Sequence, residues 1–174
     1  MEFVKGQTVV HPHHGPATIT DVTTRSIRNV PKRYLTLDVH RTTLTISVPV
    51  AGAEEIGLRP VLDTAGLREL FDVLRAPTTH EEQGWSRRLK DNQERLRTGD
   101  LLVTSGVVRD MTRRLDERGL SFGEKDLLKE ARRHLVAELA VSLGVTDERA
   151  GDMVDAAVLR GEEPALGVEL ARAG

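Results

Sequence analysis

The spacing of the hydrophobic residues changes at Arg59-Pro60, and this change divides the chain into two parts that must fold differently. Before Arg59, short runs rich in β-branched residues show partial alternation. This pattern indicates strands, because successive side chains of a strand point to opposite faces. The runs lie at residues 8–10, 17–22, 33–39 and 43–48. Turn residues separate them, so we predict a small antiparallel β barrel, an architecture often used for interaction modules.

After Pro60 the apolar residues recur at i, i+3, i+4 and i+7, which is the spacing of an amphipathic helix. The first helix is expected behind Asp63 or Thr64 and before Pro77, with an apolar face made of Leu67, Leu70, Phe71 and Leu74. Further helices are predicted over residues 80–97, 100–118, 121–144 and 146–159. Ser121 and Glu124 fit a capping box at the start of the fourth helix.

These patterns predict an α+β fold of two domains. A small antiparallel β barrel occupies residues 1–58, and an all-α bundle of about five helices occupies residues 61–160. A flexible acidic tail is expected at residues 161–174, because this stretch combines glycines, a proline and acidic residues.

Composition excludes several classes of function. The chain has no cysteine, which removes disulfides, thiol nucleophiles and cysteine-ligated metals. It has no phosphate-binding glycine loop, no nucleophile elbow and no HExxH helix, so we expect no enzyme activity and no cofactor. No apolar run is long enough to cross a membrane and the first residues do not resemble a signal peptide, so we expect a cytoplasmic protein.

Trp85 is the only tryptophan, and Arg87, Arg88 and Lys90 follow it directly. Residues 85–97 hold five cations against two acids, although the whole chain has a formal net charge of −2. A large ring beside cations is suited to contacting bases and phosphates. Trp85 also shares one helical face with Leu89, Asn92 and Leu96, so periodicity alone favours a core position, and the cations alone are equally consistent with a solvated face.

Four histidines form a second candidate site. His11, His13 and His14 lie in one short segment, and His40 is a further possible metal ligand. Adjacent His13 and His14 point to opposite faces of an extended chain, which hinders coordination of a single ion. A turn between two strands is the favoured interpretation, and the alternative is a metal-dependent enzyme.

Several segments, taken together and in this order, are similar to the bacterial CarD (CdnL) transcription regulators, particularly the actinobacterial type. The similarity extends from about residue 3 to about residue 160. The segments are Val9-Val10-His11-Pro12-His13-His14-Gly15, Leu74-Arg75-Ala76-Pro77, Trp85-Ser86-Arg87-Arg88, Val108-Arg109-Asp110, and Glu117-Arg118-Gly119-Leu120-Ser121 with Glu124-Lys125.

This resemblance implies a Tudor-like N-terminal domain that docks on the β subunit of RNA polymerase. The helical domain is then expected to contact promoter DNA at the upstream edge of the transcription bubble and to stabilise the open complex. The DNA-binding residues implied are Trp85, Arg87, Arg88, Lys90, Arg114 and Lys125. The polymerase-binding residues implied are Arg25, Ile27, Arg41, Ile46, Ser47 and Pro49. A monomer is expected, and the alternative function is an architectural DNA-binding protein that acts without polymerase.

Two positions depart from the family pattern. The family tends to place a basic residue where this chain has Ser47, and often an aromatic residue where it has His11. The resemblance therefore implies either altered polymerase affinity or transfer of the basic role to Arg41 or Arg28.

Overall fold

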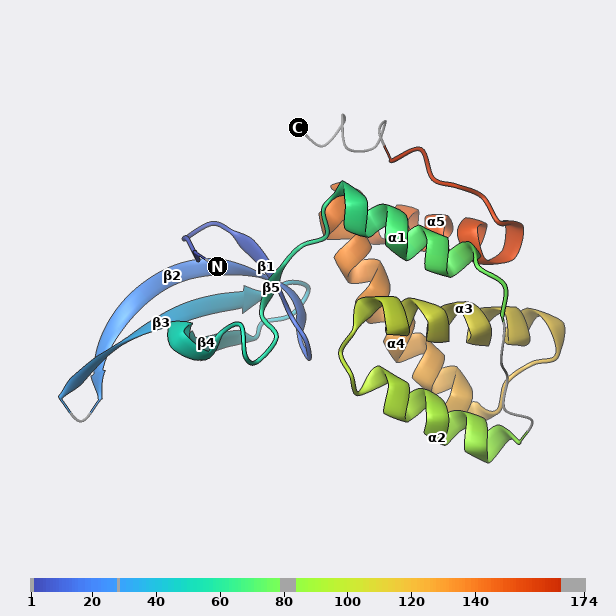
Figure 1. Cartoon of the computed structure of the whole chain (residues 1–174), viewed down its shortest axis with the longest axis horizontal. Helices are drawn as coiled ribbons and strands as arrows, with labels where there is room; N and C mark the ends of the chain where they lie inside the picture. Colours follow the sequence, from blue (N-terminus) through green and yellow to red (C-terminus); the bar gives the residue numbers. More distant parts are fainter. Residues whose placement is uncertain (1, 28, 79–83, 167–174) are drawn as a thin grey trace. The chain divides into compact units, whose positions relative to one another are not determined.

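The computed structural model describes residues 2–27, 29–78 and 84–166 (Figure 1). The chain forms two compact units, Met1–Val61 and Leu62–Gly174, and each unit has its own hydrophobic core. An antiparallel sheet makes up the first unit and five helices make up the second, which confirms the predicted α+β fold. None of the described helices is long and apolar enough to span a membrane.

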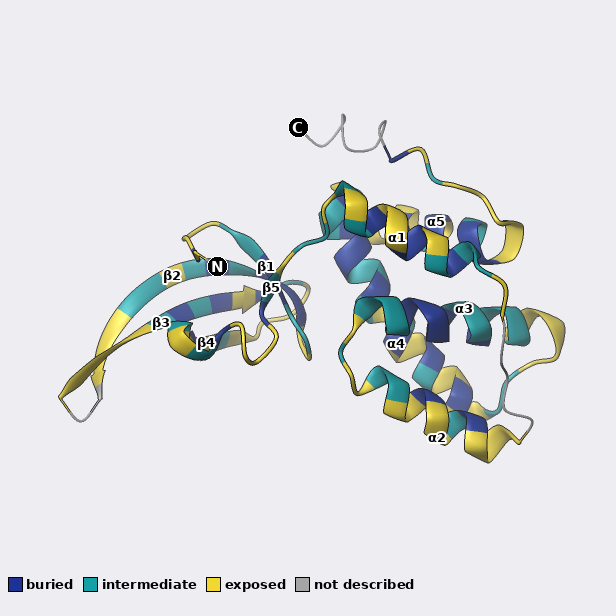
Figure 2. Ribbon diagram, viewed as in Figure 1, coloured by how far each residue is buried: buried dark blue, intermediate teal, exposed yellow. Residues whose placement is uncertain are grey.

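The first unit is a five-stranded antiparallel sheet with the strand order β4-β3-β2-β1-β5. Two of its strands are longer than the sequence predicts. β2 continues beyond Val22 and β3 begins before Arg33, and the side chains of residues 24–26 and 30–32 are exposed, so these parts show no buried alternation (Figure 2). The bounds are β1 Thr8–His11, β2 Gly15–Ile27, β3 Val30–Val39, β4 Thr45–Pro49 and β5 Arg59–Pro60, with a short 3-10 helix, η1, at Val50–Gly52.

Alternation along β3 determines which face of the sheet is buried. Leu35 and Leu37 are fully buried, and Leu37 pairs with the equally buried Ile19 of β2. Tyr34 and Thr36 alternate with these leucines and therefore lie on the outer face. The register shifts between Ile19 and Asp21, and such an irregularity bends a strand locally. This unit therefore presents one outer face of exposed and half-buried side chains beyond its core.

The second unit consists of five helices that bury their apolar faces against one another (Figure 1). The predicted apolar face of α1 is confirmed, since all four of its members are buried. The bounds are α1 Thr64–Arg75, α2 Trp85–Leu96, α3 Leu101–Glu117, α4 Phe122–Leu143 and α5 Asp147–Arg160. The α2 helix differs from the others because its buried residues are polar, Arg88 and Asn92.

Side-chain caps fix the starts of these helices. Asp63 Oδ1 accepts a hydrogen bond from the Gly66 amide at 2.8 Å, and Thr146 Oγ1 accepts one from the Arg149 amide at 3.2 Å. The capping box predicted from Ser121 and Glu124 is present at the start of α4. Each cap satisfies an amide that has no partner inside its helix.

The segment that follows α5 is not the free tail that the sequence predicts. Leu166 is only 7% exposed and belongs to the core of the helical unit. Glu163 Oε2 lies 3.3 Å from Arg75 Nη1. Leu166 adds an apolar side chain to the core, so the prediction of a flexible tail over residues 161–174 is wrong at its start. Residues 167–174 lie outside the described residues.

The histidine segment forms the turn between β1 and β2. The ring centroids of His11 and His14 are 4.7 Å apart, and His40 Nε2 hydrogen-bonds to Thr18 Oγ1 at 2.8 Å. Burial lowers the pKa of His11, and the neighbouring His14 and His13 add to this effect. Within residues 2–27, 29–78 and 84–166 no group of three or more metal-ligating side chains is placed to hold an ion. The geometry favours the turn interpretation of these histidines.

Candidate nucleic-acid interface

Trp85 is the first residue of α2 and is 60% exposed. Its angle on the helix matches that of the buried Asn92, so the expectation from periodicity was a core position. That interpretation is wrong, because a side chain in the first turn need not be covered by the neighbouring helices. The indole ring is therefore available to a partner.

The cations near Trp85 divide into two groups. Arg87 and Lys90 are exposed on α2, and Lys125 is exposed in the first turn of α4. Arg88, which the resemblance also places on the DNA-binding surface, is 7% exposed and turns inward, so its guanidinium is not part of the exposed surface beside Trp85. Arg114 is half-buried in the last turn of α3.

Arg88 is directed inward because α4 supplies a carboxylate for it. Arg88 Nε donates to Glu124 Oε1 at 2.7 Å, and both side chains are buried. The other carboxylate oxygen, Oε2, accepts from the Ser121 amide at 2.9 Å and from Ser121 Oγ at 2.6 Å. Burial alone raises the pKa of Glu124, but hydrogen bonds from Arg88 and Ser121 outweigh burial and lower the pKa below its ordinary value. Glu124 is therefore a buried, charged side chain that joins the start of α4 to α2.

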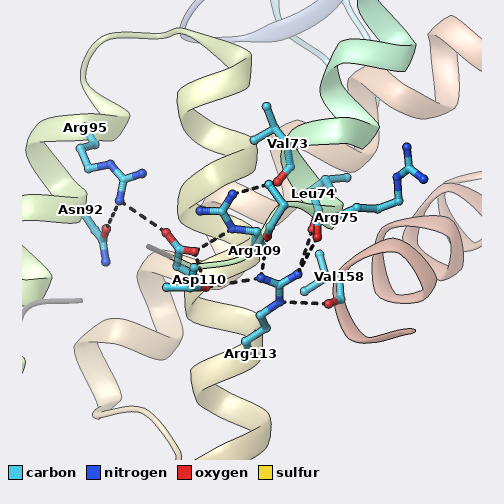
Figure 3. Close-up of polar contacts among 11 residues, drawn as sticks. Val73, Leu74, Arg75, Asn92, Arg95, Arg109, Asp110, Arg113 and Val158 are labelled. Carbon is cyan, nitrogen blue, oxygen red and sulfur yellow. Dashed lines mark hydrogen bonds and ion pairs between the residues drawn. The ribbon is translucent and has the colours of Figure 1, made fainter. Parts of the chain in front are cut away.

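A second polar junction joins α2 to α3 (Figure 3). Arg95 Nη1 lies 3.9 Å from Asp110 Oδ2 and donates to Asn92 Oδ1 at 3.2 Å. Asp110 Oδ1 also accepts from Arg109 Nε at 2.7 Å. The α2 helix is therefore held at two points by charged side chains, and Leu89 and Leu96, which follow Arg88 and Arg95 directly, are half-buried.

Arg113 of α3 ties together the ends of two further helices (Figure 3). Its Nη1 donates to the Ala76 carbonyl at 2.7 Å, and its Nε donates to the Val158 carbonyl at 3.1 Å. Its Nη2 is 3.4 Å from the Leu74 carbonyl and 3.3 Å from the Arg75 carbonyl. These carbonyls lie at the C-terminal ends of α1 and α5, where they have no partner within the helix. A single guanidinium therefore caps α1 and joins it to α5.

These junctions reduce the positive charge available to a ligand. Of the five cations in residues 85–97, Arg88 and Arg95 are engaged by Glu124 and Asp110. The remaining three, Arg87, Lys90 and Arg97, are exposed, as are the acids Asp91 and Glu94, and Lys90 Nζ lies 4.0 Å from Glu94 Oε1. The exposed excess of positive charge is therefore smaller than the sequence predicts.

One exposed residue at this site was not identified from the sequence. Phe122, the first residue of α4, is 82% exposed. A Cβ added to Gly123 would lie 3.3 Å from Leu89 Cδ2, so the start of α4 packs closely against α2. The available signal was that Phe122 lies outside the buried face of its own helix, which includes Leu128 and Leu135. We call Trp85, Arg87, Lys90, Phe122 and Lys125 the aromatic–basic surface.

The residues expected to bind polymerase lie on the sheet unit. The Arg25 guanidinium lies 5.4 Å from the centroid of the Tyr34 ring, and Tyr34 pairs with Pro49 of the edge strand β4. Ser47 is exposed and pairs with Thr36 on the same outer face. Register therefore brings Arg25, Ser47 and Pro49 to one face.

The other three expected residues are placed differently. Ile46 pairs with the buried Leu37 and is half-buried against the core, so it does not share the outer face of Ser47. Arg41 is exposed in the turn between β3 and β4, with a left-handed φ of 60°. The Ile27 side chain and Arg28 lie outside the described residues.

Comparison with known proteins agrees with this layout. The family described as "CarD-like/TRCF RID domain" matches residues 3–62, and the family described as "CarD, C-terminal domain" matches residues 69–155. The "Putative transcription factor YdeB" of Bacillus subtilis (strain 168) is 26% identical over 147 residues. The alignment covers 84% of this chain and 96% of that relative. With both of its units matched in order, the chain belongs to the CarD/CdnL family of transcription factors.

Proposed function

We propose that the chain docks on the β subunit of RNA polymerase through its sheet unit and stabilises the open promoter complex through Trp85. In this proposal, the indole enters the minor groove at the upstream edge of the bubble. The observation that carries the proposal is the 60% exposure of Trp85 at the start of a helix that two polar junctions hold in place. The family match to a CarD-like/TRCF RID domain supports the assignment of the sheet unit to polymerase.

A wedge of this kind acts by differential binding. Unstacking one base step requires a few kcal/mol, and a side chain that occupies the opened step offsets part of this free energy. A ligand with equal affinity for closed and open DNA shifts nothing, whereas a preference of about 1.4 kcal/mol shifts the equilibrium tenfold. An indole on a helix that two polar junctions hold in place is suited to this role, because the backbone that carries it has little conformational freedom to lose on insertion.

Trp85→Ala is expected to shorten the lifetime of the open complex about tenfold, because no side chain then occupies the opened base step. The measurement is dissociation of preformed open complexes in the presence of a competitor, with the matching polymerase. Trp85→Phe serves as the control, since a smaller ring should restore part of the lifetime. An unchanged lifetime in Trp85→Ala would remove the wedge role.

Arg25→Glu is expected to weaken binding to the polymerase β subunit by at least about tenfold, because it reverses a charge on the outer face of the sheet. The measurement is affinity for the isolated β subunit by pull-down and titration. Arg33→Glu is the matched control, since Arg33 is also exposed. Arg25 pairs with Lys32, so the next residue, Arg33, points to the opposite face of the sheet from Arg25. Equal affinity of the two variants would place the docking surface elsewhere.

The small exposed charge excess weighs against an architectural protein that acts without polymerase. Binding to naked DNA depends mainly on phosphate neutralisation and falls steeply with salt. Three exposed cations against two acids in residues 85–97 supply few such contacts. Tight, salt-sensitive binding to naked promoter DNA would favour the architectural protein instead.

A further inference from the structure

Phe122 has an exposure that the fold does not explain. At 82% it is more exposed than the other large hydrophobic side chains of residues 2–27, 29–78 and 84–166. Its neighbours in the first turn of α4 have structural roles, since Ser121 caps the helix and Glu124 binds Arg88. Phe122 adds nothing to the core and exposes a full ring to water, which is unfavourable by about 2 kcal/mol for a side chain of this size.

A single exposed apolar residue is common on proteins, but Phe122 does not stand alone. Arg88 and Glu124 are joined at 2.7 Å, and the two residues lie one turn or less from Trp85 and Phe122 respectively. Gly123 also packs against Leu89. The first turns of α2 and α4 are therefore in contact, and each presents an exposed aromatic side chain.

The distribution of aromatic residues supports a shared role. The chain has only five aromatic side chains, and Phe3 and Phe71 are buried in the two cores. Tyr34 lies under the Arg25 guanidinium on the sheet unit. The remaining two, Trp85 and Phe122, are both exposed and both belong to the α2–α4 junction.

The charges around these rings indicate which partner they fit. Lys125 follows Phe122 by three residues, so both lie on one side of α4, and Lys125 is exposed. Arg87 and Lys90 are exposed on α2. Aromatic rings beside cations form the usual platform for nucleic acid, in which rings stack on bases and cations hold the adjoining phosphates.

We propose that Phe122 is a second aromatic contact to promoter DNA. It packs against a base or sugar next to the step that Trp85 occupies, and Lys125 holds the phosphate of that nucleotide. This inference rests on the proposed function, which brings the helical unit to the bubble edge. It also makes the contact longer than one step, so the open complex is held by two rings on two helices.

Phe122→Ala is expected to shorten the lifetime of the open complex about fivefold, the effect of losing about one base stack. The experiment uses the full chain and polymerase holoenzyme. Phe122→Trp should retain the lifetime, because a larger ring can still stack. Leu159→Ala is the control for an exposed apolar residue far along the sequence on α5, since Leu159 is 44% exposed. A Phe122→Ala lifetime equal to that of the Leu159→Ala control would overturn the proposal.

A photoreactive phenylalanine analogue at position 122 identifies the partner directly. Irradiation of the complete open complex should attach the protein to DNA at the upstream edge of the bubble. Attachment to polymerase alone, or to neither, would overturn the DNA contact. The result is independent of the wedge: if Trp85→Ala has no effect while position 122 still attaches to DNA, the proposed wedge fails and the contact stands. If Trp85→Ala acts and position 122 does not reach DNA, only the second contact fails.

Discussion

Glu124→Ala is expected to lower the free energy of unfolding of the helical unit by about 3–5 kcal/mol, the usual effect of removing one partner of a buried ion pair. The substitution leaves the Arg88 guanidinium inside the protein without its carboxylate. It also removes the acceptor that caps the Ser121 amide at the start of α4. Both losses act on the same junction, so α2 keeps only its apolar packing against α4.

The measurement is urea denaturation of the full chain followed by far-UV circular dichroism, which reports mainly on the five helices. Glu130→Ala is the matched control, because Glu130 lies on the same helix in an exposed pair with Arg133. Such a pair contributes at most about 1 kcal/mol. If Glu124→Ala is no more destabilising than Glu130→Ala, the Arg88–Glu124 junction does not support the unit.

The lowered pKa of Glu124 gives this prediction a pH dependence. A carboxyl group whose folded-state pKa lies below its unfolded value stabilises the fold above the unfolded pKa. This contribution is lost as pH falls through the folded pKa, because the native state must then bind a proton. Glu124→Gln should therefore flatten the loss of stability in this acid range relative to the wild type. Glu130→Gln should flatten it less, because Arg133 also lowers the pKa of Glu130 but that ion pair is exposed to solvent.

Arg113→Ala is expected to lower the free energy of unfolding by about 2–4 kcal/mol. The variant removes hydrogen bonds from a charged donor to the carbonyls of Ala76 and Val158, and each buried carbonyl left without a donor is unfavourable by about 1–3 kcal/mol. Truncation also opens space between α1, α3 and α5. The loss should appear in the same urea titration.

Arg113→Lys distinguishes charge from geometry. An ammonium group carries the same charge but lacks the planar fork that reaches several carbonyls, so it should recover only a minor part of the stability. Arg133→Ala is the control for loss of an exposed arginine, with an expected change within about 0.5 kcal/mol. Full recovery in Arg113→Lys would show that charge alone matters at this position.

The sequence predicts much of the fold because the relevant signals are local. The apolar spacing of Leu67, Leu70, Phe71 and Leu74 predicts α1, and Ser121 with Glu124 predicts the start of α4. The sequence does not predict the outer parts of β2 and β3, because strands exposed on both faces show no alternation of apolar and polar residues. The sequence does not predict the burial of Leu166, because the core residues around it are distant in sequence.

The candidate site was less predictable, because its arrangement depends on tertiary contacts. The sequence places Arg88 beside Arg87, and nothing local distinguishes the two. The difference arises from Glu124, 36 residues further along the chain, which draws Arg88 inward. Likewise, helical periodicity assigns Trp85 an inward angle but does not indicate that the first turn of α2 leaves this side chain exposed. Phe122 lies near Trp85 only because of the tertiary contact of α2 with α4, which no local pattern encodes.

The short connection between the two units has a further consequence for binding. Only residues 61–63 separate β5 from α1, and each unit has a core of its own. In the proposed complex, docking of the sheet unit turns DNA contact into an intramolecular step, with an effective concentration of the order of millimolar for a short tether. A DNA contact with a dissociation constant of about 1 mM is then about half occupied at the promoter. The same contact remains almost empty on DNA elsewhere, so weak intrinsic affinity becomes a source of selectivity.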